Sequence, residues 1–321
     1  MKIILTGASG FIGTNLMSTL IDGHHELLNL DISPASNQEH EPYRANVDIM
    51  DGEALSKSVT DFQPDVFIHL AGRTDCDENT TVEEDYQANV EGVENVLEAV
   101  KICPSIERLI MTSTQYVCGP GRMPDNDEDY YPHTVYGHSK VETEKLTREA
   151  NLKCDWVIIR PVNIWGPYHE RYSREFWKIA DKGLYLHPGV PSPTRTYGYV
   201  GNIVWQILKM IEADRQVVDR QVFYVGDKPI NIEKWVMGFC LGFRGKKPRV
   251  IPMWMMRLMG KMGDLISKFT GKPFYITSSR LRSMTGDYYA PMDKTFDVFG
   301  EPPYTLEQGI NDTVEWYRSK K

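Results

Sequence analysis

Lys2-Ile-Ile-Leu-Thr-Gly-Ala-Ser-Gly-Phe-Ile-Gly13 is the stretch of sequence that decides the fold. The apolar run at residues 3–5 predicts a short buried strand, and helical spacing follows in Phe11, Ile12, Leu16, Leu20 and Ile21. Gly7 permits the tight turn between the two, Gly10 lets the backbone approach a phosphate, and Gly13 lets the helix pack closely on the strand. The stretch therefore predicts a strand–turn–helix unit whose helix N-terminus can bind an anion.

The second predicted strand, Glu26 to Asp31, ends in an acid. A carboxylate at this distance from a glycine turn accepts hydrogen bonds from an adenosine ribose and repels a 2′-phosphate. We therefore expect a dinucleotide site that prefers NAD to NADP. Two plainer interpretations stay open: a glycine triplet alone is weak evidence, and Asp31 could be an ordinary turn residue.

Size and charge narrow the function. A chain of 321 residues can bury a large core, and its formal net charge of −8 argues against a general nucleic-acid binder. The five scattered cysteines predict free thiols, with neither a disulfide framework nor a metal site. The first strand begins at residue 2 and no apolar run reaches about 18 residues, so we expect no signal peptide, no membrane span and a cytoplasmic location.

Strands and helices alternate along the first half of the chain. Further strands are predicted at 44–49, 65–72, 107–114 and 155–160, with helices at 51–62, 82–102 and 134–149. This order predicts an α/β fold, a Rossmann-type doubly wound parallel sheet. We expect residues 1–165 to form the dinucleotide-binding domain, with 196–226 returning to it, and residues 166–195 and 227–321 to form a smaller C-terminal substrate-binding lobe.

Three residues at predicted strand ends and on one helix carry candidate chemistry: Thr114, Tyr136 and Lys140. Tyr136 and Lys140 are four apart on a helix and share a face. A nearby ammonium favours the phenolate, so we expect Lys140 to lower the pKa of Tyr136, which could then take a proton from a substrate hydroxyl. His69 lies inside an apolar strand, where a hydrogen-bonded core histidine is a better interpretation than a catalytic one.

The sequence resembles the extended short-chain dehydrogenase/reductase family, particularly its NAD-dependent nucleotide-sugar epimerase/dehydratase branch. The likeness covers nearly the whole chain. It rests on Thr6-Gly-Ala-Ser-Gly-Phe-Ile-Gly13, His69-Leu-Ala71, Asn89-Val-Glu-Gly92, Thr112-Ser-Thr114, Tyr136-Gly-His-Ser-Lys140, Arg160-Pro-Val-Asn-Ile-Trp-Gly-Pro167, Arg195-Thr-Tyr-Gly-Tyr-Val200, Phe299-Gly-Glu-Pro-Pro303 and Leu306-Glu-Gln-Gly309.

The resemblance implies a role for each matching residue. Thr114, Tyr136 and Lys140 would be catalytic, and Thr114, Asn163 and Arg195 would bind substrate, with Arg195 on a diphosphate oxygen unless it forms a surface ion pair. The NAD contacts would be Gly7, Gly10, Phe11, Ile12, Asp31, Asp48, Ile49, Leu70, Ala71, Asn89, Tyr136, Lys140 and Val162. Helices 82–102 and 134–150 would form a homodimer interface, although their apolar stripes could equally be core faces.

Three departures from the family pattern matter. Gln115 and Tyr116 stand where dehydratases of this branch carry an Asp-Glu pair, and a neutral amide and a phenol disfavour dehydration. Cys118 replaces a usual tyrosine, as a packing residue or, less plausibly, a reactive thiol. Asn202 stands where an aspartate is usual, which leaves its contacts open.

Residues 243–272 are the least family-like segment, rich in Met, Arg and Lys with the single acid Asp264. Such a helix could lie on an anionic membrane or dock a partner. We expect instead a lid helix packed on the lobe, because methionine fills irregular gaps well.

These features predict an NAD-dependent epimerase of a nucleotide sugar, acting at the sugar C4 carbon through a transient keto intermediate. A dehydrogenase or reductase of a nucleotide sugar or sterol-like alcohol is the alternative. A non-catalytic NAD-sensing protein is less favoured, because Tyr136 and Lys140 are both present.

Overall fold

The computed structural model describes residues 1–188, 192–271, 277–278, 281 and 286–321. They fall into two compact units. The first comprises Met1–Tyr168, Gly198–Asp227 and Ala290–Tyr304, and the second comprises the described parts of His169–Tyr197, Lys228–Tyr289 and Thr305–Lys321.

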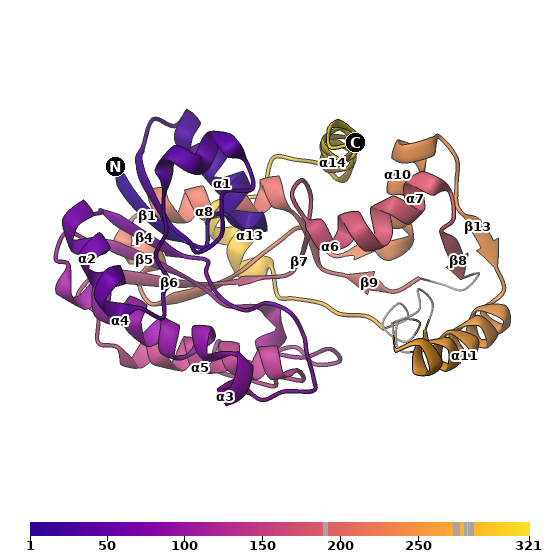
Figure 1. Ribbon diagram of the computed structural model, residues 1–321, viewed down its shortest axis with the longest axis horizontal. Helices are drawn as coiled ribbons and strands as arrows, with labels where there is room; N and C mark the ends of the chain where they lie inside the picture. The colour runs from indigo at the N-terminus through magenta and orange to yellow at the C-terminus, as the bar shows by residue number, and fades with distance from the viewer. Residues whose placement is uncertain (189–191, 272–276, 279–280, 282–285) are drawn as a thin grey trace. The chain divides into compact units, whose positions relative to one another are not determined.

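A seven-stranded sheet forms the centre of the first unit, and every pairing in it is parallel. Its spatial order is β11-β6-β5-β4-β1-β2-β3, and Figure 1 shows β1, β4, β5 and β6 side by side. The strands are β1 (Lys2–Thr6), β2 (Glu26–Leu30), β3 (Arg44–Ala45), β4 (Val66–His69), β5 (Arg108–Thr112), β6 (Asp155–Pro161) and β11 (Gln221–Val225). The direction of travel reverses between β1 and β4, and sheets of this kind bind ligands at that point.

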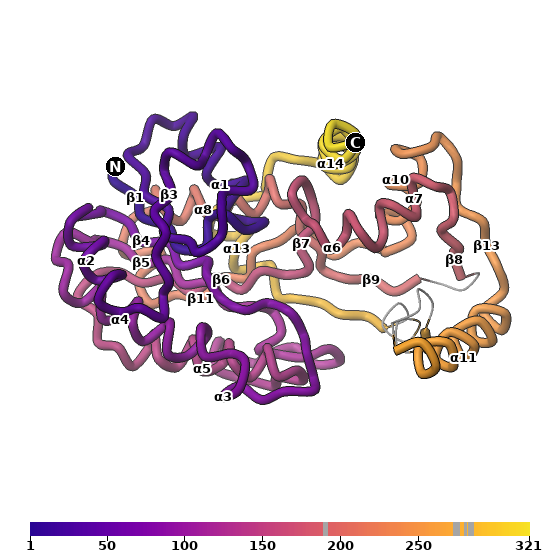
Figure 2. The backbone as a smooth tube through the Cα atoms, in the orientation of Figure 1, coloured from indigo at the N-terminus to yellow at the C-terminus, as the bar shows by residue number. Residues whose placement is uncertain are grey.

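Helices cover both faces of this sheet (Figures 1 and 2). α1 packs against α8 on one face, and α2 packs against α4 on the other. The helices of the unit are α1 (Phe11–Asp22), α2 (Gly52–Phe62), α3 (Val82–Asp85), α4 (Glu91–Ile102), α5 (Val135–Glu149), α8 (Val200–Glu212), α9 (Arg215–Val218) and α13 (Asp293–Phe299), with short turns η1 (Gln38–Tyr43), η2 (Gln87–Asn89) and η3 (Gln115–Val117).

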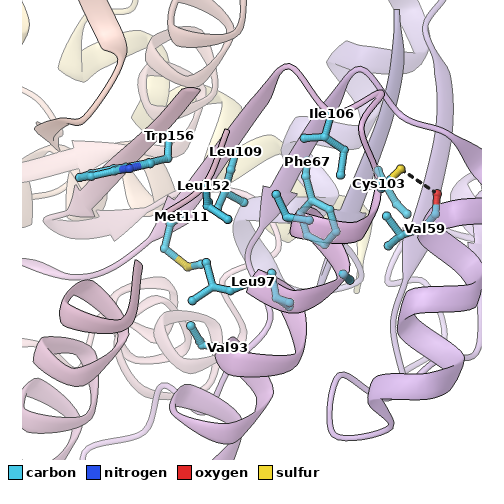
Figure 3. Packing of buried hydrophobic residues seen from close by; sticks show 14 of the residues in the cluster. Val59, Phe67, Val93, Leu97, Cys103, Ile106, Leu109, Met111, Leu152 and Trp156 are labelled. Carbon is cyan, nitrogen blue, oxygen red and sulfur yellow. Dashed lines mark hydrogen bonds between the residues drawn. The ribbon is translucent and has the colours of Figure 1, made fainter. Parts of the chain in front are cut away.

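The core between the sheet and α2 and α4 explains why these strands are so apolar. Alternate strand residues such as Ile4, Phe67 and Leu109 pack against Val59 of α2 and Val93 of α4 (Figure 3). Their neighbours along each strand point to the opposite face, which is also buried, so each strand is a continuous apolar run.

The second unit is built around aromatic residues. Trp235 stacks on Phe176 at 4.9 Å between ring centroids and meets Phe239 at 4.8 Å. Its elements are α6 (Glu170–Tyr172), η4 (Ser173–Trp177), α7 (Lys178–Lys182), β8 (Leu186–Pro188), β9 (Thr194–Arg195), β12 (Ile230–Asn231), α10 (Ile232–Arg244), β13 (Arg249–Ile251), α11 (Met253–Thr270) and α14 (Leu306–Ser319). Two short strands, β7 (Asn163–Trp165) and β10 (Tyr197–Tyr199), pair with each other.

The parallel sheet confirms the predicted fold class, but two predicted elements are wrong in extent. The strand expected at 44–49 covers only Arg44–Ala45. The single helix expected at 82–102 is broken into α3, η2 and α4, because Tyr86 and Asn89 both turn inward and are fully buried at a three-residue spacing that a short 3₁₀ turn provides. Of the helices in the described residues, none is both long enough and apolar enough to span a membrane.

Candidate active site

Gly7, in the turn between β1 and α1, and Gly13, in the first turn of α1, have no room for a side chain. Gly7 has φ of +73°, and a Cβ there would lie 2.5 Å from the backbone nitrogen of Ala71. A Cβ at Gly13 would lie 2.3 Å from the Cα of Ala8. Gly10 is the residue before α1, and Phe11 and Ile12 form its first turn, half-buried. The turn between β1 and α1 therefore lies against the end of β4, at the reversal point of the sheet.

Asp31 lies beside this turn, directly after β2. Its carboxylate accepts hydrogen bonds from the Ser9 N–H at 3.0 Å and the Ser33 N–H at 2.8 Å. Ionised carboxylate oxygens have further lone pairs, and the side chain is only half-buried. Asp31 can therefore accept hydroxyl donors at the mouth of the glycine turn.

Asn89, the last residue of η2, holds the segment after β4 in place. Its side-chain amide accepts from the Arg73 N–H and donates to the Arg73 carbonyl, both at 2.9 Å, and also donates to Ser139 Oγ at 2.9 Å. These bonds fix the segment that follows Leu70 and Ala71. The role that this geometry assigns to Asn89 is positioning, and its direct contact with NAD stays a prediction.

The remaining predicted cofactor residues lie further along the same sheet. Asp48 is exposed, and its carboxylate accepts the Met50 N–H at 2.9 Å. Ile49 is buried in the core beneath α4. Val162 is buried and packs so closely on Gly226 that a Cβ there would lie 2.5 Å from its methyl group. Direct NAD contact by these three residues also stays a prediction.

Thr114 and Tyr136 lie together. Thr114 follows β5 and its hydroxyl caps η3 by accepting the Tyr116 N–H at 3.3 Å. The side chain of Tyr136, in the first turns of α5, lies close enough to Thr114 for hydrogen bonding between them to lower the pKa of Tyr136. Both residues are nearly fully buried. The structure therefore brings together two of the three residues predicted to be catalytic.

Lys140 is one helical turn further along α5. Its ammonium donates to the Thr112 carbonyl at 3.0 Å, and its Nζ lies 3.5 Å from where a Cβ would stand on Gly72. Lys140 thus bonds the end of β5 and lies close to the segment that follows β4. Burial lowers the pKa of Lys140 to about 8, and the carboxylate of Glu144 opposes that shift.

The pKa of Tyr136 differs from the sequence expectation. Burial raises this pKa well above its ordinary value, and the hydrogen bond from Thr114 only partly offsets the rise. Taking the phenol out of water penalises its anion more than the neighbouring groups stabilise it. Burial therefore disfavours the Tyr136 phenolate, and a positive charge beside the phenol would favour it.

Tyr116 is a neighbour that the sequence argument treated only as a missing acid. Its ring stands edge-on to Tyr136 at 6.1 Å between centroids, and its hydroxyl donates to Asn163 Oδ1 at 3.5 Å. Asn163 is the first residue of β7 and was predicted to bind substrate. Tyr116 thus connects Asn163 with the Tyr136 ring.

A buried ion pair between α5 and β6 supports the site, and it was not predicted from the sequence. Glu144 and Arg160 are almost completely buried, and their side chains meet at 2.7 Å and 2.8 Å. Glu144 also accepts the Ser113 hydroxyl at 2.6 Å. Ser113 lies between Thr112, whose carbonyl accepts from Lys140, and Thr114. The Glu144–Arg160 pair therefore anchors the end of β5, which carries the site.

Three other residues singled out in the sequence have structural partners. His69 Nδ1 lies 2.7 Å from Thr6 Oγ1, and burial lowers its pKa to about 3, as suits a neutral core histidine. Burial raises the pKa of the Cys118 thiol, which disfavours a reactive thiolate. Asn202 donates to Asp227 at 2.7 Å, which a second carboxylate could not do.

Arg195 belongs to the second unit. It lies in β9, and its guanidinium Nε donates to the Gly286 carbonyl at 2.9 Å. Its backbone bridges Tyr288. The guanidinium is thereby supported from within its own unit, and a role on substrate stays a prediction.

The chain is similar to known proteins along almost its whole length. It is 29% identical over 98% of its length to the N-acetyl-alpha-D-glucosaminyl-diphospho-ditrans,octacis-undecaprenol 4-epimerase of Escherichia coli O157:H7, covering 95% of that protein. It is 27% identical to the UDP-glucose 4-epimerase of Vibrio cholerae, covering 98% of this chain and 94% of the relative. It is 24% identical to the 3-beta-hydroxysteroid dehydrogenase of Mycolicibacterium neoaurum, covering 98% and 91%.

Solved structures agree on the fold. The UDP-glucose 4-epimerase of Thermotoga maritima superposes with a TM-score of 0.76 at 21% identity, covering 100% of this chain and 99% of that one. The family model described as "NAD dependent epimerase/dehydratase family" matches residues 3–226. The expectations of NAD and of an enzyme are confirmed. This chain belongs to the NAD-dependent epimerase/dehydratase family.

Proposed function

We propose that the protein is an NAD-dependent 4-epimerase whose substrate is a sugar carried on a diphosphate, as in a nucleotide sugar. The 4-epimerases of Escherichia coli O157:H7 and Vibrio cholerae support the reaction and the substrate class. The observation that carries the proposal is the buried pair Thr114 and Tyr136, with the buried Lys140 one turn further along α5 on the Thr112 carbonyl, at the edge of the sheet where the glycine turn lies.

The first unit has the residues to hold the cofactor. The glycine turn at Gly7 and Gly10 and the α1 N-terminus fit a pyrophosphate, and Asp31 fits the adenosine ribose. Leu70 and Ala71 lie against the same turn, because a Cβ at Gly7 would meet the backbone there. When bound, NAD supplies a hydride acceptor and a positive charge on its nicotinamide ring.

Tyr136 then acts on the substrate. We assign its phenol, deprotonated beside a positive charge, the removal of the proton from the sugar C4 hydroxyl as hydride leaves C4. Thr114 hydrogen-bonds the same oxygen, and the Lys140 ammonium stabilises the phenolate. The keto-sugar turns over, hydride returns to the other face of C4, and the same phenol gives the proton back, so no net oxidation occurs.

Asn163 and Arg195 are the proposed substrate contacts. The hydrogen bond from Tyr116 orients the Asn163 amide. A guanidinium fork matches the geometry of a diphosphate, which suits Arg195. In this assignment Arg195 contacts a diphosphate oxygen of the substrate.

A dehydrogenase is the second candidate. The match to the 3-beta-hydroxysteroid dehydrogenase favours it. In this candidate function the Tyr136 phenol and the Lys140 ammonium keep the same roles, and NADH is released. The two reactions differ in whether hydride returns to the substrate.

The test is incubation of the purified protein with UDP-glucose or UDP-N-acetylglucosamine and no added NAD, followed by NMR. We expect the C4 epimer to form while the absorbance of NADH stays flat. NADH that accumulates in step with an oxidised product, and appears only when NAD is added, would replace the epimerase with the dehydrogenase.

Two further expectations remain proposals. We infer a homodimer through the faces of α4 and α5, as the resemblance implies, and a cytoplasmic location. Sedimentation equilibrium tests the first, and fractionation of the source cells tests the second.

A further inference from the structure

Helix α11 was expected to pack as a lid, but most of its apolar residues are exposed. Only Met256, Gly260 and Gly263 are buried among its 18 residues. The large apolar side chains on its exposed surface are Trp254, Met255, Leu258, Met262, Leu265, Ile266 and Phe269. The expectation of a packed lid is therefore wrong for the helix as described.

The buried residues form a narrow seam. Met256, Gly260 and Gly263 recur at spacings of four and three, which puts them on one side of the helix. A Cβ on Gly260 would lie 3.3 Å from the Ser278 nitrogen, so the small residue allows close approach. Asp264 accepts the Ser278 N–H at 3.1 Å, which occupies the only acid of the segment on that side.

The exposed apolar residues form a second, separate face. Residues 254, 258, 262, 265 and 269 follow spacings of four, four, three and four, so they align along the helix. Trp254 is 66% exposed and Phe269 is 82% exposed. Side chains of this size are rarely left in water as a continuous stripe.

Positive charge borders this face. Arg257, Lys261 and Lys268 are exposed and recur at spacings of four and seven, beside the apolar stripe. The segment just before the helix adds the exposed cations Arg244, Lys246, Lys247 and Arg249. This concentration is unusual in a chain whose formal net charge is −8.

We propose that α11 binds the surface of an anionic phospholipid bilayer, with Trp254, Leu258, Met262, Leu265 and Phe269 inserted among the acyl chains and the bordering cations on the lipid phosphates. An amphipathic helix with a basic border and aromatic residues on its apolar face suits this position in the membrane interface. A symmetric contact between two copies of α11 would bring the same cations together, so charge disfavours a second copy as the occupant.

The charge and the apolar face make separate contributions. Each basic residue near an anionic surface contributes roughly fivefold to partitioning, so three contribute about 100-fold. The apolar side chains contribute through the area that they remove from water. The inference does not depend on the catalytic reaction, because it rests on the second unit alone.

The experiment is co-sedimentation of the full chain with vesicles of phosphatidylcholine, with and without about one-third phosphatidylglycerol. We expect binding to the anionic vesicles only, and loss of binding at high salt. Replacing Trp254 and Phe269 by Ser should weaken it about tenfold or more, and Arg257→Gln/Lys261→Gln/Lys268→Gln should weaken it about 100-fold.

Matched controls are available elsewhere in the chain. Leu184→Ser removes an apolar side chain that is 63% exposed, and Lys57→Gln removes an exposed cation, so neither should change binding. Wild-type protein that stays in the supernatant with anionic vesicles would overturn the proposal. Equal binding to both vesicle types would also overturn it, as would dimerisation that the α11 variants abolish without any vesicle binding.

Discussion

Replacing Glu144 by Gln removes one charge from the buried pair behind the site. Gln keeps the shape of the side chain, so the perturbation is the loss of a carboxylate that contacts Arg160 at 2.7 Å and 2.8 Å. Both side chains are at most 1% exposed, which leaves the Arg160 charge buried without its partner. Breaking such a pair from one side costs about 3–5 kcal/mol.

Urea unfolding followed by circular dichroism measures this cost. Glu142→Gln is the matched control, because Glu142 is on the same helix and pairs with Lys145 at 2.9 Å with both side chains about half exposed. We expect the control to cost less than about 0.5 kcal/mol. Adding Arg160→Met to Glu144→Gln should recover part of the loss, since it removes the unpaired charge.

The same variant should affect activity through Ser113. The variant replaces the charged acceptor of the Ser113 hydroxyl by a neutral amide oxygen, which accepts a weaker hydrogen bond, so the adjacent Thr114 is less firmly placed. We expect a fall in kcat beyond any loss of folded protein. A Glu144→Gln variant as stable and as active as Glu142→Gln would refute the reasoning.

Three further predictions follow from single residues. Gly7→Ala should weaken NAD binding more than tenfold, because the new Cβ would meet the Ala71 backbone. Gly121 also has a positive φ but open space around it, so Gly121→Ala should leave NAD binding unchanged. Equal effects of the two variants in a cofactor titration would contradict this. Asp31→Ala should weaken NADH binding about tenfold and improve the preference for NADPH, measured by fluorescence titration. The pKa of His69 falls from 6.5 in the unfolded chain to about 3 in the fold, so only the unfolded state binds that proton between these values. The free energy of unfolding should fall as pH drops below 6.5, by up to about 1.4 kcal/mol per pH unit from this residue, and His69→Asn should flatten that slope in urea titrations at several pH values.

The parallel sheet was predictable because its signals are local. The glycine turn and the buried runs in β1, β4, β5 and β6 each report on a few adjacent residues. The break between α3 and α4 was not predictable, since it depends on the burial of Tyr86 and Asn89, which the packing of the whole unit decides.

In the site, too, some features could be predicted from the sequence and others could not. The order of Thr114, Tyr136 and Lys140 in the chain indicated which side chains could meet. The pKa of Tyr136 could not be predicted, because the largest cause of its rise is burial, which depends on the packing of the whole unit. The exposure of α11 could not be predicted either. An apolar pattern with helical spacing predicts an apolar face on the helix, but not whether another part of the chain covers that face.

The most direct test of the central claim is the turnover rate of Tyr136→Phe measured with a 4-epimerase substrate, beside Tyr116→Phe as the control that removes a neighbouring phenol. The account predicts that Tyr136→Phe keeps its fold and its NAD but loses about 10³-fold in kcat, while Tyr116→Phe loses far less. A Tyr136→Phe enzyme that retains a rate near that of the control would contradict the account.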